Sequence, residues 1–105
     1  MRRGEVWWAD LGRPAGRRPV LLLSRDVAYR VRANVTVAPV TRTIRDIPTE
    51  VVLGRQDGMS EQSVVNLDDI ITIPKRLLER PITALSQEKM VQVEQAIAFA
   101  LALPT

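Results

Sequence analysis

The chain has 105 residues, which is enough for a single domain spanning 1–105 and too few for two. It contains no Cys and no His, so thiol nucleophiles, histidine general bases and zinc sites built on these side chains are excluded. Hydrophobic residues make up 46% of the sequence but aromatic residues only 4%, so the core must consist mainly of Val, Leu and Ile.

The positive charge is concentrated in the N-terminal half. Residues 1–45 hold ten Arg against three acidic residues, a net charge of +7. Residues 46–105 hold five basic and nine acidic residues, a net charge of −4, which gives the total of +3. An Arg-rich half-chain indicates a polyanionic partner, because the guanidinium fork fits phosphate oxygens. The alternative is a solvated basic face with no partner.

The N-terminal segment does not predict a targeting signal. Two acidic residues, Glu5 and Asp10, follow the basic start where a signal peptide would have an apolar stretch. The longest apolar stretch, residues 96–103, is too short to span a bilayer. We therefore expect a cytoplasmic protein without membrane contact.

The first part of the chain predicts two strands and two loops. Residues 5–9 predict a strand, and the glycines and proline within 12–18 predict a loop. Residues 19–24 are almost wholly apolar, so we expect a strand buried on both faces. Residues 25–33 are polar and basic, and predict a loop with at most one helical turn.

The middle of the chain predicts a series of short strands. Residues 34–40 alternate between apolar and polar side chains, which is typical of a strand, and a second basic loop follows at 41–48. Further strands are predicted at 50–53, 63–66, 70–73 and 82–85, with a turn at 54–58 and a single helical turn at 74–79. The strands at 63–66 and 70–73 can also be read as one strand bent at Asp68-Asp69.

The chain closes with a predicted amphipathic helix. Ser86 is a suitable N-cap, Glu88 lies in the first turn, and Pro104 stops the helix. One apolar stripe follows the helical period through Met90, Val93, Ile97, Ala100 and Leu101. Short strands closed by one helix predict a mainly β fold, namely a small, strongly curved antiparallel sheet or barrel with the C-terminal helix packed on it.

Four segments in order resemble the MazF/PemK family of toxin endoribonucleases. They are Arg-Gly-Glu-Val-Trp-Trp-Ala-Asp-Leu at 3–11, Arg-Pro-Val-Leu-Leu-Leu-Ser at 18–24, Pro-Val-Thr at 39–41, and 63–70 together with 73–77. The resemblance covers nearly the whole chain. It implies an SH3-like small barrel, a homodimer, and cleavage of single-stranded RNA at short sequences without a metal or other cofactor. It also implies a cognate antitoxin whose acidic, initially disordered segment covers the RNA groove.

The catalytic Arg and Thr of the family match Arg18 and Thr41 in this sequence. RNA can be cut by attack of its own 2′-hydroxyl on the adjacent phosphorus, which leaves a 2′,3′-cyclic phosphate and a 5′-hydroxyl. A fixed guanidinium and a hydroxyl donor can stabilise the charge that develops on the phosphoryl oxygens. From spacing alone, Arg18 can instead be a surface ion-pair residue and Thr41 an ordinary strand end.

The first loop departs from the family pattern. It is shorter than in many relatives, and no carboxylate lies between Asp10 and Asp26, so any general acid or base that relatives place there is absent. The sequence therefore assigns no general base. Asp68-Asp69 does not predict a magnesium site, because adjacent residues on a strand point to opposite faces.

Candidate RNA-binding residues flank Arg18 and Thr41 in the two basic loops. Adjacent tryptophans on a strand face opposite ways, so Trp8 shares a face with Val6 and is expected in the core. Trp7 can stack a base or line a dimer contact, although packing is favoured for both tryptophans. The RNA-binding candidates are Arg13, Arg17, Arg42, Arg45 and Trp7.

Two other functions fit the same fold. One is a nucleic-acid-binding module without catalysis, which the same charge would serve. The other is a toxin resembling CcdB that poisons DNA gyrase. Such toxins rely on a C-terminal Trp, whereas this sequence ends in Ala-Leu-Pro-Thr.

Overall fold

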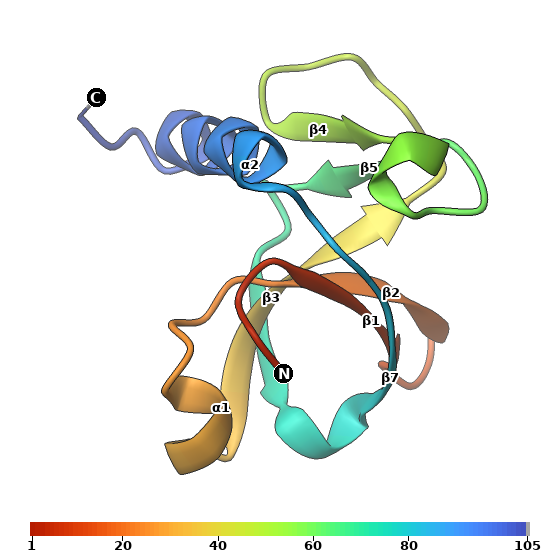
Figure 1. The fold of residues 1–105 in the computed structure, drawn as a ribbon, viewed down its shortest axis with the longest axis vertical. Coiled ribbons are helices and arrows are strands. Elements are labelled where there is room, and N and C mark those ends of the chain that lie inside the picture. Colours follow the sequence, from red (N-terminus) through yellow and green to blue (C-terminus); the bar gives the residue numbers. More distant parts are fainter. Residues whose placement is uncertain (105) are drawn as a thin grey trace.

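A computed structural model describes residues 1–104, which form a seven-stranded antiparallel sheet and a C-terminal helix (Figure 1). The strands are β1 (Glu5–Asp10), β2 (Arg17–Leu22), β3 (Asn34–Thr41), β4 (Glu50–Leu53), β5 (Ser63–Asn66), β6 (Ile71–Pro74) and β7 (Leu78–Ala84). The helices are α1 (Ala28–Val31) and α2 (Gln87–Ala100), with 3-10 turns η1 (Arg55–Asp57) and η2 (Lys75–Leu77). The predicted mainly β fold with a C-terminal helix is confirmed.

The sheet is strongly curved but does not close into a ring. Its strand order is β4-β5-β3-β2-β1-β7, and β6 pairs with the first half of β3. The other end of β3 pairs with β5 through Val40 and Thr41. In residues 1–104, η2 joins β6 to β7 and no ladder pairs these two strands. The prediction of a curved sheet is therefore confirmed, whereas a fully closed barrel is not formed.

Several predicted boundaries differ from the structure. The strand predicted at 19–24 spans Arg17–Leu22, so Arg17 and Arg18 lie in β2 and not in the predicted loop. The largest difference is near the end of the sheet. The last strand was predicted at 82–85 but runs through Leu78–Ala84, and the predicted helical turn at 74–79 shrinks to η2. In β7, Leu78 is buried whereas Glu79, Arg80 and Pro81 are exposed. β7 pairs only with β1 and lies at the sheet edge, so several of its residues are polar and face solvent. The sequence of β7 therefore lacks the apolar pattern from which a strand is predicted.

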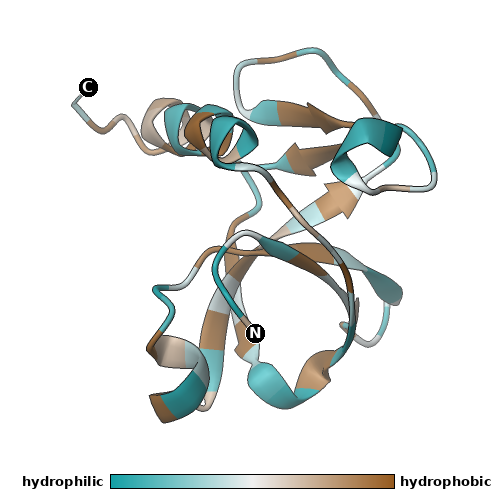
Figure 2. Ribbon diagram, in the orientation of Figure 1, coloured by the Kyte–Doolittle hydropathy of each residue, from teal (hydrophilic) through white to brown (hydrophobic). Residues whose placement is uncertain are grey.

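The strands β1, β2 and β3 separate two apolar clusters. Val20, Leu21 and Leu22 of β2 are each fully buried, as predicted for a strand covered on both faces. Leu21 packs in one cluster with Val93 of α2, and its two neighbours pack in the other. In Figure 2 the strands β4 and β5 beside α2 are coloured as hydrophobic, whereas η1 is hydrophilic.

Helix α2 begins as predicted and ends earlier than predicted. The Ser86 hydroxyl accepts a hydrogen bond of 3.1 Å from the Lys89 backbone N–H, which caps the helix. Met90 and Val93 are buried, but Leu101 at the end of the predicted stripe is 57% exposed. The helix ends at Ala100, and the chain turns through a left-handed backbone conformation at Ala102, with φ of 55°, before it reaches Pro104.

Candidate active site

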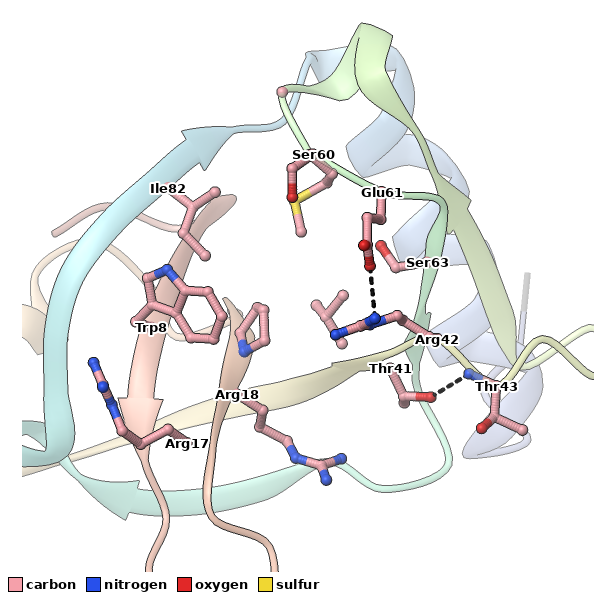
Figure 3. Close-up of a pocket in the computed structure, with 14 residues that line it drawn as sticks. Trp8, Arg17, Arg18, Thr41, Arg42, Thr43, Ser60, Glu61, Ser63 and Ile82 are labelled. Atoms are coloured by element: carbon pink, nitrogen blue, oxygen red, sulfur yellow. Dashed lines mark hydrogen bonds and ion pairs between the residues drawn. The ribbon is translucent and has the colours of Figure 1, made fainter.

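A cavity of about 550 Å³ opens where β2 begins, where β3 ends and beside the loop that follows η1 (Figure 3). Arginines and a threonine form one side of the cavity, and apolar side chains form much of the rest. The lining residues are Trp8, Arg17, Arg18, Pro19, Val40, Thr41, Arg42, Thr43, Gly58, Met59, Ser60, Glu61, Ser63 and Ile82.

The sheet brings Arg18 and Thr41 together. The β2–β3 ladder pairs Val20 with Pro39, and the same register continued by two residues places Arg18 opposite Thr41. Figure 3 shows the Arg18 side chain extending below Thr41. The Thr41 Oγ1 accepts a hydrogen bond of 2.9 Å from the Thr43 backbone N–H, which leaves the hydroxyl proton available for a ligand.

Arg18 is only lightly held by the protein. Its Nη2 donates to the carbonyl oxygen of Ala15 at 3.3 Å, and it forms no ion pair within residues 1–104. Its Nε is buried and has no hydrogen-bond partner among these residues. A buried donor without a partner is costly, so this guanidinium is suited to binding an acceptor such as a phosphate oxygen.

The two neighbouring arginines are each paired with a glutamate. Arg17 donates from Nε and Nη2 to Oε1 of Glu79 at 2.9 and 2.6 Å. Arg42 Nη1 lies 2.8 Å from Oε2 of Glu61 across the mouth of the cavity. Both pairs are solvent-exposed, so they are weak and an incoming phosphate can compete for either arginine.

The cavity also has a surface suited to a nucleobase. Ser63 is only 4% exposed, and its hydroxyl has no hydrogen-bond partner within residues 1–104. Trp8 and Ile82 lie side by side on the opposite side of the cavity (Figure 3). An aromatic face together with a hydroxyl can hold an unstacked base, while the arginines bind the adjacent phosphate.

The two tryptophans have different surroundings: Trp7 is packed, as favoured from the sequence, whereas Trp8 is not in the core. Trp8 shares a face with Val6 as predicted, but it lines the cavity instead of joining the core, so that expectation is wrong. The strand runs beyond the apolar cluster that covers Val6, and the cavity opens at Trp8. Trp7 does not line the cavity; it packs against the cluster containing Ala9, and its indole N–H donates to Glu5 Oε1 at 2.9 Å.

Two of the other RNA-binding candidates also lie outside the cavity. Arg13 is exposed on the loop between β1 and β2, and Arg45 is exposed on the loop between β3 and β4. The Arg45 backbone N–H donates to Glu50 Oε1 at 2.8 Å, which fixes that loop while the side chain faces solvent. The cavity thus joins Arg17, Arg18, Thr41 and Arg42, and it leaves out Arg13, Arg45 and Trp7.

Sequence reasoning missed the loop that forms the third side of the cavity. Residues 58–63 supply Met59, Glu61 and Ser63 to the lining. The loop begins at Gly58, whose φ is +89° and whose Cα closely approaches Thr83 of β7. The glycine signals a turn, but only the pairing of distant strands places this turn beside Arg18.

The adjacent aspartates have structural partners. Asp68 Oδ2 accepts a hydrogen bond of 2.7 Å from Thr49 Oγ1, and Asp69 Oδ2 accepts one of 2.9 Å from Asn66 Nδ2. Residues 1–104 contain no group of three or more carboxylates, histidines or cysteines placed to hold a metal ion. No helix in the described part of the chain is both long enough and apolar enough to cross a membrane.

A curved sheet with three arginines and two threonines around one cavity defines a small β protein equipped to bind a phosphodiester. The chain belongs to the family described as PemK-like, MazF-like toxin of type II toxin-antitoxin system, whose model matches residues 2–101. It is 38% identical to the probable endoribonuclease MazF5 of Mycobacterium tuberculosis, covering 94% of this chain and 91% of that one. It is 35% identical to the endoribonuclease EndoA of Bacillus subtilis, covering 98% and 96%.

Solved structures show the same similarity in three dimensions. The Mycobacterium tuberculosis toxin MazF-mt6 superposes with a TM-score of 0.89 at 37% identity, covering 96% of this chain and 99% of that chain. A mycobacterial endoribonuclease in complex with its cognate antitoxin also has a TM-score of 0.89, at 34% identity, covering 100% and 98%. The family resemblance predicted from sequence is therefore confirmed.

Proposed function

We propose that this chain is the toxin of a type II toxin–antitoxin system and that it acts as one domain, 1–105. In this proposal it is an endoribonuclease that cleaves single-stranded RNA at short sequences without a metal cofactor. Its relatives are named endoribonucleases, and the observation that carries the proposal here is the placement of Arg18 and Thr41 at one cavity. Cleavage of cellular RNA would inhibit translation and growth.

Arg18 and Thr41 can stabilise the reaction without forming a covalent bond. The 2′-hydroxyl of the substrate attacks the adjacent phosphorus, and negative charge accumulates on the phosphoryl oxygens. Arg18 donates to these oxygens from its guanidinium, whose Nε has no partner within residues 1–104, and the Thr41 hydroxyl adds a neutral donor. The products are a 2′,3′-cyclic phosphate and a 5′-hydroxyl.

The proposed partners follow from the charge and from the relatives. A cognate antitoxin with an acidic, initially disordered segment would neutralise the cavity arginines, and a related mycobacterial endoribonuclease is known in complex with its antitoxin. We also propose a homodimer, because Phe99 of α2 and Val52 of β4 are 62% and 41% exposed. A cytoplasmic location is inferred from the RNA substrate.

The test is incubation of the purified protein with a long RNA in EDTA, followed by mapping of the new ends. We expect cleavage to persist and to leave 2′,3′-cyclic phosphate and 5′-hydroxyl ends. RNA that shifts in mobility without new ends would instead indicate a binding module without catalysis. Activity lost in EDTA and restored by magnesium would contradict the metal-free mechanism.

A further inference from the structure

The proposed cleavage requires a group that takes the proton from the attacking 2′-hydroxyl. The chain has no His, and its first loop has no carboxylate between Asp10 and Asp26. We propose that Glu61 is this proton acceptor, the general base of the reaction. The inference rests on the proposed function and extends it to a residue on the loop after η1.

Glu61 is the one acidic residue among those that line the cavity. Three arginines share the lining with it, and the glutamate that pairs with Arg17, Glu79, is not part of the lining. A carboxylate is a competent general base when it lies within hydrogen-bond reach of the proton it removes. Because the other lining side chains are cationic, hydroxyl-bearing or apolar, Glu61 is the lining side chain best suited to accept a proton at neutral pH.

The position of Glu61 suits an in-line attack. Figure 3 shows Glu61 reaching from the 59–61 segment towards Arg42, on the side of Thr41 opposite to Arg18. A phosphate whose phosphoryl oxygens are held by Arg18 and Thr41 would then present one side to the carboxylate, where the 2′-hydroxyl can attack, and the leaving 5′-oxygen would lie on the other side. The attacking and leaving oxygens also lie on opposite sides of phosphorus in such a displacement.

The ion pair with Arg42 can hold the carboxylate in place. Glu61 approaches Arg42 most closely through Oε2, at 2.8 Å from Nη1, which leaves Oε1 to face a substrate hydroxyl. The Glu61 side chain is 58% exposed, so RNA can reach it without a rearrangement of the core. Arg42 directly follows Thr41, so the base and the hydroxyl donor are tied to the same end of β3.

The step conserves atoms and charge. The 2′-O–H bond breaks, its proton moves to Glu61, and the 2′-oxygen forms a bond to phosphorus. The bond between phosphorus and the 5′-oxygen then breaks, and this oxygen takes a proton from water. The proton on Glu61 returns to solvent after the products leave.

The test compares Glu61→Gln with Glu79→Gln. Both substitutions remove a carboxylate that pairs with a cavity arginine, but only the first changes a lining residue. The measurement is the single-turnover rate at saturating enzyme as a function of pH, with an RNA that the wild type cleaves. We expect Glu61→Gln to lower the rate about 10²–10⁴-fold and to remove the part of the pH profile due to a carboxylate. Glu79→Gln should keep the wild-type rate and the wild-type pH profile. Glu61→Asp should cleave faster than Glu61→Gln, because it keeps a carboxylate.

The alternative is that Glu61 only neutralises Arg42. In that case Glu61→Gln frees a cation, binds RNA more tightly, and cleaves as fast as the wild type or faster. That result, or a change in affinity with an unchanged rate constant, would overturn the inference. The proposed function fails separately, if the wild type does not cleave RNA or if Arg18→Ala has no effect. Circular dichroism of each variant shows whether the fold is intact. Glu61→Asp keeps the carboxylate and serves as the conservative variant.

Discussion

At the scale of single residues, Arg18 is expected to be the arginine on which the chemical step depends most. Arg18→Ala removes a fixed donor from the developing charge, and loss of one such donor costs about 10²–10³ in rate. Arg18→Lys should rescue poorly, because an ammonium lacks the planar fork, and Thr41→Ala should cost less than Arg18→Ala. Single-turnover cleavage at saturating enzyme separates chemistry from binding.

The matched control for Arg18 is Arg30→Ala, which removes one positive charge from an exposed position of helix α1. It should leave the single-turnover rate close to that of the wild type. If a folded Arg18→Ala variant cleaves at the wild-type rate while Arg30→Ala does not, the assignment of Arg18 is incorrect for this chain.

Tyr29, the single tyrosine, gives the fold a sensitivity to alkaline pH. It is 6% exposed, and burial raises its pKa to about 12 from the ordinary value of about 10. Between these values the unfolded chain loses the phenolic proton and the folded chain keeps it. The free energy of unfolding should therefore fall as pH rises, by at most about 1.4 kcal/mol per pH unit.

The measurement is urea unfolding of the wild type and Tyr29→Phe at about pH 9 and about pH 11. Phenylalanine lacks the titrating hydroxyl, so the stability of the wild type relative to Tyr29→Phe should decrease between the two values. Other alkaline titrations affect both proteins and cancel in the comparison. An unchanged difference would show that the folded protein does not suppress the ionisation of Tyr29.

At the scale of elements, the sequence predicted the strands with buried apolar side chains better than β7, whose residues are mostly exposed or half-buried. The run of Val20, Leu21 and Leu22 identifies β2 because both of its faces are covered. In β7 the exposed Glu79 and Arg80 conceal the pairing with β1, which depends on residues seventy positions away. Local sequence patterns were also insufficient to predict the whole site. Arg18 and Thr41 match local motifs, whereas Glu61 and Ser63 reach the cavity only through tertiary packing.

The loop from Gly58 to Ser63 is the element on which the site depends most. A Cβ at Gly58 would lie 2.2 Å from the Thr83 Oγ1, and φ is +89°. Gly58→Ala should therefore displace the loop, lower the stability and reduce cleavage. Gly12→Ala is the matched control, because its φ is also positive, at +70°, but a Cβ there meets no atom within 4 Å.

Backbone strain alone costs about 1–2 kcal/mol at either glycine. Thermal unfolding should show a larger loss of stability for Gly58→Ala than for Gly12→Ala, and the cleavage assay should show a loss only for Gly58→Ala. Equal effects of the two substitutions on both measurements would mean that the contact between Gly58 and Thr83 does not position the loop.

At the scale of the whole molecule, the uneven distribution of charge should make RNA binding sensitive to salt. Three arginines line the cavity, and each phosphate that they neutralise releases counterions from the RNA. For single strands, each contact contributes about −0.7 to the slope of log affinity against log salt, so three contacts predict a slope of about −2. Glu79 yields Arg17 to a phosphate as the complex forms, whereas Arg42 can contact a phosphate through its other N–H groups while Nη1 stays paired with Glu61.

This slope can be measured by titrating a fully 2′-O-methylated RNA, which binds but has no free 2′-hydroxyl to attack. Arg17→Gln should make the slope shallower by about 0.7, because one phosphate contact is lost. Arg30→Gln removes the same charge from α1, away from the cavity, and should leave the slope unchanged. If Arg17→Gln and the wild type have the same slope while Arg30→Gln is shallower, the RNA backbone follows the face that carries α1, and the cavity is not its path.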